Sequence, residues 1–234
     1  MPGKPGRSLA IEPIVFRHLN RKGKTMHTLV IGMSGSGKTT LVKWLTAAMK
    51  KKGIKVAVLD PLLDPEWNAD FITSDSAEFM RYVKQNKSHV LVVDESGSAI
   101  GRYNEAMNWL ATTSRHLGHT TFFIMQGATQ VDPIIRGQCS KCFMFTCAGP
   151  ISDKIAIEMN EPKVSKGSRL KKGCFYLIDS YQELIQGRLD WATKSVKIGV
   201  DFDDSTEPAK EEKRDEKPSE TIDSGSDLNG DSSL

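Results

Sequence analysis

A glycine-rich turn between an apolar segment and a helical one is the feature that most restricts the fold of this chain. The turn reads Gly32-Met-Ser-Gly-Ser-Gly37-Lys38-Thr39 and fits the pattern G-x-x-x-x-G-K-[ST] in full. It follows the apolar strand candidate His27–Ile31, and the residues after it, Thr40-Leu-Val-Lys-Trp-Leu, begin a helix. A strand, such a turn and a helix in this order predict a phosphate-binding P-loop within an α/β sheet.

The residue types of this loop explain how it would bind a nucleotide. Glycines let consecutive backbone N–H groups turn toward the phosphates, and the N-terminus of the following helix is positive. Lys38 is expected to reach the β- and γ-phosphates, and the Thr39 hydroxyl to ligate Mg²⁺. We therefore expect ATP to contact Gly32, Ser34, Gly35, Ser36, Gly37, Lys38, Thr39 and Thr40.

A second apolar run ends in two carboxylates, in the sequence Val90-Leu-Val-Val-Asp94-Glu95. At the end of a strand beside the P-loop, Asp94 would support Mg²⁺ through a water molecule. Glu95 would then be placed to activate water for attack on the γ-phosphate. A strand end followed by a helix cap is the simpler alternative for the same two acids.

The next strand candidate, Thr121–Met125, ends at the polar residue Gln126. In hydrolases of this layout that position lies between the P-loop strand and the acidic strand. Gln126 is therefore a candidate for orienting the attacking water or sensing the γ-phosphate. Arg115, before this strand, and Arg136, after it, are candidate arginine fingers toward a neighbouring subunit, and we prefer Arg115. A surface salt bridge is the alternative for each arginine.

Short apolar strands alternate with helical stretches along the chain, which predicts an α/β fold with a mostly parallel sheet flanked by helices. Further strands are expected at Lys55–Leu59, His89–Val93 and Cys142–Cys147. Helices are expected after Lys38 and at Ser76–Lys87, Tyr103–Ser114 and Ser152–Met159, with Asp75 or Ser76 capping the second. A C-terminal hairpin is expected from Cys174–Ile178 and Gln182–Gln186.

Charge divides the chain into three parts. The chain contains 32 Lys and Arg and 29 Asp and Glu. Residues 201–234 hold four of these basic residues and twelve of the acidic ones, so residues 1–200 carry a net charge of +11. We expect a basic N-terminal arm at 1–25, a P-loop ATPase domain at 26–200 and an acidic disordered tail at 201–234. The basic domain favours a polyanionic partner.

Several classes of protein are excluded. The sequence contains no apolar run long enough for a transmembrane helix, and its N-terminus lacks the apolar core of a secretory signal. Four cysteines clustered late in the chain do not form a disulfide framework, so we expect a reducing cytoplasm.

In their order along the chain, the P-loop, the Asp94-Glu95 strand and the Gln126 strand resemble the FtsK–HerA superfamily of P-loop ATPases, over roughly residues 26–190. Within this superfamily the chain is most similar to the genome-packaging ATPases of double-stranded DNA viruses with an internal membrane, of the tectivirus type. This narrower resemblance is carried by the stretches Thr-Ser-Arg115-His116-Leu-Gly-His, Gln126 and Asp-Pro-Ile-Ile-Arg136-Gly. The resemblance implies a RecA-like core with strand order 5-1-4-3-2 and a homo-oligomeric ring, commonly a hexamer. It also implies translocation of double-stranded DNA into a preformed capsid, docking to capsid vertex proteins, and a location in the virion, at its packaging vertex, and in the host cytoplasm.

A motor that moves along any DNA sequence should contact phosphates. The candidate contacts are the loop Ser96–Arg102 and the basic residues Lys163, Lys166, Arg169, Lys171 and Lys172. For each of these, a solvated loop is the alternative. Two other functions stay open: a small P-loop kinase, with acceptor-dependent release of ADP unaffected by DNA, and a nucleotide-binding assembly protein without useful turnover.

Overall fold

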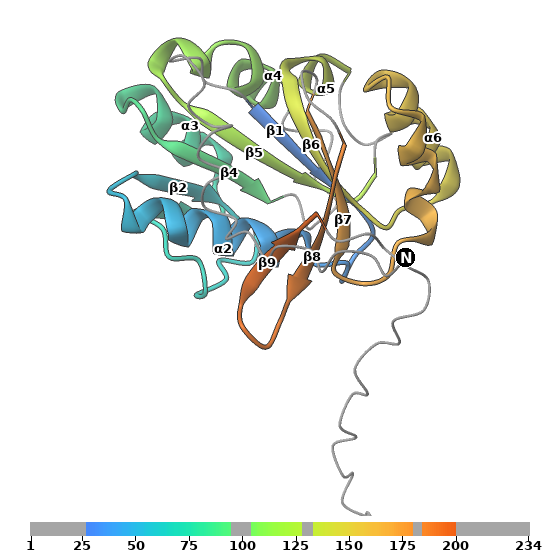
Figure 1. Ribbon diagram of the computed structural model, residues 1–234. Coiled ribbons are helices and arrows are strands. Elements are labelled where there is room, and N and C mark those ends of the chain that lie inside the picture. The colour runs from blue at the N-terminus through green and yellow to red at the C-terminus, as the bar shows by residue number, and fades with distance from the viewer. Residues whose placement is uncertain (1–26, 95–103, 128–132, 180–183, 200–234) are drawn as a thin grey trace, which may run out of the picture. The chain divides into compact units, whose positions relative to one another are not determined.

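The computed structural model describes residues 27–94, 104–127, 133–179 and 184–199, which form a nine-stranded sheet covered by helices (Figure 1). The predicted arm (1–25), the predicted tail (201–234), Glu95 and the loop Ser96–Arg102 lie outside the described residues. No helix in the four described ranges is both long enough and apolar enough to cross a membrane.

The strands lie in the order β3-β2-β4-β5-β1-β6-β7-β8-β9. Neighbouring strands from β3 to β6 in this order run parallel, and β7, β8 and β9 extend the sheet in antiparallel fashion. The bounds are β1 (His27–Ile31), β2 (Val56–Leu59), β3 (Phe71–Thr73), β4 (Val90–Asp94), β5 (Thr120–Met125), β6 (Cys139–Phe145), β7 (Cys174–Asp179), β8 (Ile185–Asp190) and β9 (Ser195–Ile198).

The RecA-like core is confirmed. The five parallel strands expected from the sequence are β1, β2, β4, β5 and β6, and numbered among themselves they follow the order 5-1-4-3-2. The sheet exceeds this core at both edges. At one edge the three-residue strand β3 pairs with β2, and Phe71 stacks on Tyr82 with ring centroids 4.0 Å apart.

The C-terminal hairpin is confirmed, but the range predicted for its second strand is wrong. β8 runs from Ile185 to Asp190 instead of Gln182 to Gln186, and β9, which was not predicted, follows it. In the observed register Gly187 lies opposite Phe175. A Cβ at residue 187 would come within 2.4 Å of the Phe175 ring, so this register depends on a glycine beside that ring.

Helices cover both faces of the sheet, which explains why the parallel strands are apolar along their whole length. α2 packs on one face, while α3, α4, α5 and α6 pack on the other. In β1, Val30 faces α2, and Leu29 and Ile31 face the opposite side. The bounds are α2 (Lys38–Lys51), α3 (Ser76–Gln85), α4 (Asn104–Thr112), α5 (Pro133–Gln138) and α6 (Gly149–Glu158), with 3₁₀ segments η2 (Ser114–Leu117) and η4 (Pro162–Arg169).

Of the two cap candidates for α3, the structure selects Asp75, whose carboxylate accepts from the N–H groups of Ala77 and Glu78. The four cysteines are buried free thiols.

Candidate nucleotide-binding and hydrolysis site

A pocket of about 180 Å³ lies where β1, β4 and β5 reach their carboxyl ends. Ligands of open α/β sheets bind at this edge. The pocket brings together residues from the P-loop, from β4 and β5, and from the turn after β8. It is lined by Ser34, Gly35, Gly37, Lys38, Thr39, Thr40, Asp94, Ile124, Met125, Gln126 and Trp191.

The first and last glycines of the loop motif are required by close packing. At Gly37, with φ of 110°, a Cβ would lie 2.6 Å from Cδ1 of Leu189. At Gly32 a Cβ would lie 2.7 Å from Cβ of Phe145. Gly32 and Ser36 shape the loop but are not among the described residues that line the pocket. The Ser36 carbonyl accepts from the N–H of Gly173 at 3.0 Å, which ties the loop to the C-terminal strands.

Lys38 holds its ammonium group against the backbone of the loop. Nζ of Lys38 donates to the carbonyl of Met33 at 2.8 Å, and burial lowers the pKa of Lys38. At the start of α2, which is described in full, Gly37 supplies no side-chain cap and the first turn contains no acid. The N–H groups of this turn therefore remain available to an anion, as a phosphate site requires.

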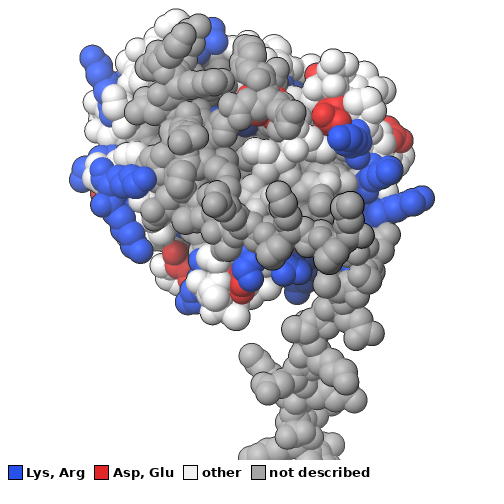
Figure 2. All heavy atoms as spheres, in the orientation of Figure 1, with Lys and Arg blue, Asp and Glu red and all other residues white. Residues whose placement is uncertain are grey.

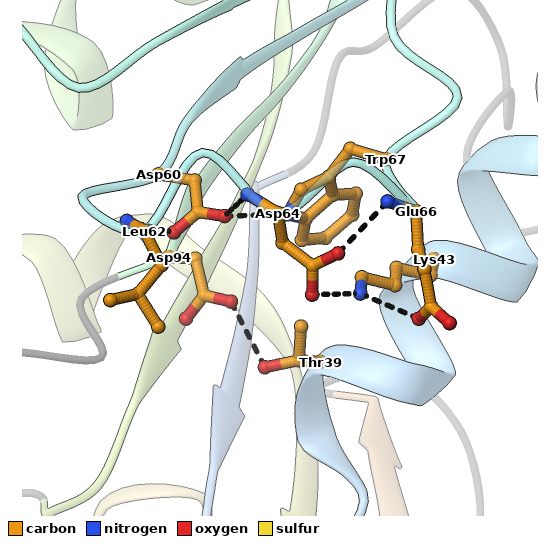
Figure 3. Close-up of polar contacts among 8 residues, drawn as sticks. All are labelled: Thr39, Lys43, Asp60, Leu62, Asp64, Glu66, Trp67 and Asp94. Carbon is orange, nitrogen blue, oxygen red and sulfur yellow. Dashed lines mark hydrogen bonds and ion pairs between the residues drawn. The ribbon is translucent and has the colours of Figure 1, made fainter.

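The Thr39 hydroxyl donates to Oδ2 of Asp94 at 2.9 Å, so the P-loop and the acidic strand meet in the pocket (Figure 3). Asp94 is 5% exposed, and burial raises its pKa to about 6, with Asp60 adding to the effect and the Thr39 hydrogen bond opposing it. A hydroxyl and a carboxylate are oxygen ligands of the kind that Mg²⁺ prefers, so the pair fits the metal. Mg²⁺ would supply charge neutralisation at the β- and γ-phosphates.

Asp60 is a second buried acid that the sequence analysis missed. It is 2% exposed and follows β2, which pairs with β4. Its carboxylate accepts from the N–H groups of Leu62 and Asp64, each at 2.9 Å, and from Nε1 of Trp67 at 3.1 Å (Figure 3). The available signal was an apolar strand ending in Asp, the same pattern that singled out Asp94.

Lys43 of α2 fastens the segment 60–67 beside the pocket. Its ammonium forms ion pairs with Asp64 and Glu66 and lies 5.5 Å from the centroid of the Trp67 ring (Figure 3). The helix that begins at the P-loop is therefore tied to the loop that Asp60 organises.

The structure brings Gln126 into the pocket with Lys38 and Asp94, whereas both candidate arginines lie elsewhere. Arg115 lies in η2, before the start of β5, and Arg136 lies in α5, before the start of β6. Each arginine therefore lies at the amino end of a strand whose carboxyl end borders the P-loop. A strand about 20 Å long separates each arginine from the P-loop. Neither arginine lines the pocket of its own chain within the described ranges.

The two arginines differ in their surroundings. The Arg136 side chain is 7% exposed and binds Glu158 of α6 through two hydrogen bonds, Nε to Oε2 at 2.8 Å and Nη2 to Oε1 at 2.9 Å. Arg115 is exposed and donates from Nη1 to Oε1 of Gln138 at 3.2 Å. Arg136 is therefore held in a buried ion pair within its own subunit, whereas Arg115 is an exposed residue with a hydrogen bond to Gln138.

The basic residues proposed to contact DNA are all exposed: Lys163, Lys166, Arg169, Lys171 and Lys172. Three of them lie in η4, which packs against α6. Figure 2 shows Lys and Arg side chains projecting from the margin of the molecule where α6 lies in Figure 1.

The fold and the site together define a P-loop ATPase. The family model described as helicase HerA, central domain, matches residues 20–64, a range that contains the P-loop and α2. This match supports the resemblance to the FtsK–HerA ATPases. No curated protein sequence matches the chain.

Solved structures share the fold at low sequence identity. The genome packaging NTPase B204 of Sulfolobus turreted icosahedral virus 2 is 18% identical, with a TM-score of 0.55 over 74% of this chain and 95% of that one. The pCW3 conjugation coupling protein TcpA is 15% identical, with a TM-score of 0.53 over 70% of this chain and 60% of that one. The type VII secretion ATPase EccC of Thermomonospora curvata is 14% identical, with a TM-score of 0.53 over 73% of this chain and 27% of that one.

Proposed function

We propose that this chain hydrolyses ATP to translocate double-stranded DNA, and that it packages a viral genome into a preformed capsid. The observation that carries the hydrolytic part is the Thr39–Asp94 hydrogen bond, which joins the P-loop to the acidic strand. Gln126 lines the same pocket, where it would sense the γ-phosphate. Glu95, which follows Asp94 in the sequence, would polarise the attacking water.

The position of Arg115 supports a ring. Because Arg115 precedes β5 and the P-loop borders the carboxyl end of that strand, the guanidinium would serve the nucleotide of an adjacent copy. Each ATP would then lie at a subunit boundary of a homo-oligomer, for which we propose a hexamer.

Two findings support DNA as the cargo: the exposed basic residues of the 163–172 stretch, and the fold shared with a viral genome packaging NTPase. DNA held through its phosphates would be moved whatever its sequence. Packaging further implies docking to capsid vertex proteins, and action at the packaging vertex of the virion and in the host cytoplasm.

The test is steady-state ATP hydrolysis with and without long duplex DNA over a range of salt concentrations, with Lys38→Ala as the blank. We expect stimulation by DNA of any sequence that decreases as salt rises. Replacing Lys163, Lys166 and Arg169 by Gln should reduce this stimulation and the salt dependence but leave DNA-free hydrolysis unchanged. A matched control replaces the exposed residues Lys51, Lys52 and Lys87 by Gln.

Two results would contradict the proposal. Release of ADP that requires a phosphoryl acceptor and ignores DNA would indicate the small P-loop kinase. Tight ATP binding and oligomerisation without hydrolysis, in the presence of DNA and capsid, would indicate the assembly protein.

A further inference from the structure

A tryptophan from the C-terminal part of the chain lines the nucleotide pocket. Trp191 immediately follows β8, far in sequence from the P-loop, yet it borders the same pocket as Gly37 and Thr40. Trp191 is 46% exposed, so part of its indole surface is open to a ligand. An exposed indole at the rim of a ligand pocket is a surface on which a planar group can stack.

The indole is fixed in position by its neighbours. Its Cη2 lies 3.5 Å from where a Cβ of residue 37 would be, and its Nε1 lies 3.4 Å from where a Cβ of residue 173 would be. Both residues are glycines, so the ring approaches the P-loop backbone closely. Trp44 of α2 packs against it edge-to-face, with centroids 5.8 Å apart. A platform held in this way loses little side-chain entropy when a ligand stacks on it.

The size of the pocket leaves the base of a nucleotide to be accounted for. At about 180 Å³ the pocket is smaller than the roughly 300–1,000 Å³ of sites that enclose a whole small-molecule ligand. Gly35, Gly37, Lys38 and Thr39 account for the phosphates and the metal. A pocket of this size would leave the base at the rim, and Trp191 is the aromatic side chain among the described residues that line it.

We propose that Trp191 is the base-stacking platform of this site, on which the base of the bound nucleoside triphosphate lies against the open face of the indole. The inference rests on the proposed function, because it requires a nucleotide on the P-loop. Stacking uses the π-face that every base possesses, so this contact adds affinity while discriminating little between adenine and guanine.

The test compares two ligands that share the phosphates but not the base. Titration calorimetry on the full chain, with Mg²⁺, would measure the Kd of the β,γ-methylene analogue of ATP and that of inorganic tripolyphosphate. Trp191→Ala should raise the Kd of the ATP analogue about 5- to 150-fold and leave the Kd of tripolyphosphate within about twofold. The corresponding GTP analogue should be affected as strongly.

Three further variants serve as controls for this result. Trp191→Phe keeps an aromatic face and should bind the ATP analogue nearly as well as the natural chain, whereas Trp191→Leu keeps apolar packing on Trp44 and should behave like the alanine variant. Trp109→Ala removes a tryptophan on α4, outside the pocket, and should leave both constants unchanged. Thermal melting verifies that each variant folds.

The proposal is overturned if Trp191→Ala binds the ATP analogue as tightly as the natural chain does. It is also overturned if the variant weakens tripolyphosphate equally, since Trp191 would then act through the loop backbone at Gly37. Failure of the proposed function gives a different result: Lys38→Ala would bind tripolyphosphate as well as the natural chain.

Discussion

Arg136 of α5 and Glu158 of α6 form a two-pronged ion pair that joins two helices on the same face of the sheet. Arg136 is thereby bound within its own subunit. For this reason we propose Arg115 as the arginine finger of the proposed ring.

Arg136→Ala should destabilise the fold while Arg115→Ala should not. Removing Arg136 leaves the Glu158 carboxylate, which is 33% exposed, without its partner, and should lower the free energy of unfolding by about 2–3 kcal/mol. Arg115 is exposed, so its loss should cost less than about 0.5 kcal/mol. Chemical denaturation measures both values. Adding Glu158→Ala, alone and together with Arg136→Ala, completes the double-mutant cycle that gives the coupling energy.

Arg115→Ala should nonetheless abolish hydrolysis. In rings mixed with Lys38→Ala subunits, activity should return, because an intact P-loop can meet an intact Arg115 at some boundaries. Absence of rescue would favour Arg136 or a contact within the subunit.

Asp94→Asn should stabilise the protein in the absence of Mg²⁺ and nucleotide. The pKa of Asp94 is about 6 in the fold and about 3.9 in an unfolded chain, so between these values the folded state binds more protons. The free energy of unfolding therefore falls as pH rises through this window, and above it the natural chain carries a buried charge. The variant should gain about 1–3 kcal/mol at pH 7.5 and nothing near pH 4.

The comparison must be made between variant and natural chain at each pH. Burial lowers the pKa of His27 to about 4. Because of this residue the free energy of unfolding rises with pH through the same range, which offsets the decrease caused by Asp94. An equal gain at pH 4 and pH 7.5 would mean that the charge of Asp94 is not its source.

Glu95→Gln should retain ATP binding and lose turnover by about 10²–10⁴-fold, the range associated with removal of a general base. Calorimetric binding and steady-state hydrolysis, measured on the same preparation, test this expectation. Hydrolysis at the natural rate would remove Glu95 from the role of base.

Asp60→Ala should lower the free energy of unfolding by about 2–4 kcal/mol, because three donors lose their acceptor, including the buried Nε1 of Trp67. It should also lower the pKa of Asp94, which the nearby Asp60 charge raises. Chemical denaturation followed by tryptophan fluorescence measures the first effect, and NMR titration of the carboxyl carbons measures the second. Asn68→Ala, at an exposed position directly after this loop, is the control.

The parallel core could be predicted because its signals are local. β1 has the predicted bounds, and β5 differs by one residue, since both are continuous apolar runs ended by glycine or a polar residue. α6 begins at Gly149 instead of Ser152 because Pro150 fits the first turn of a helix. The P-loop residues were recognisable for the same reason, as each is defined by its neighbours in the motif.

The rest depended on contacts between residues distant in sequence. β3 has three residues and is held by the Phe71–Tyr82 stack, which no local pattern records. The register of β8 follows from Gly187 lying opposite Phe175. Trp191 enters the nucleotide pocket only because β8 returns to the P-loop, so its place in the site could not be inferred from the residues around it.

The position of β1 at the centre of the sheet has a consequence for biosynthesis. It is the first strand of the described chain to leave the ribosome, yet both of its partners, β5 and β6, are made much later, ending at Met125 and Phe145. At about 5–20 residues per second, the P-loop strand waits on the order of 5–20 s before both neighbours exist. Chains interrupted before residue 145 should therefore lack an assembled nucleotide site and expose an unpaired apolar strand to chaperones and proteases.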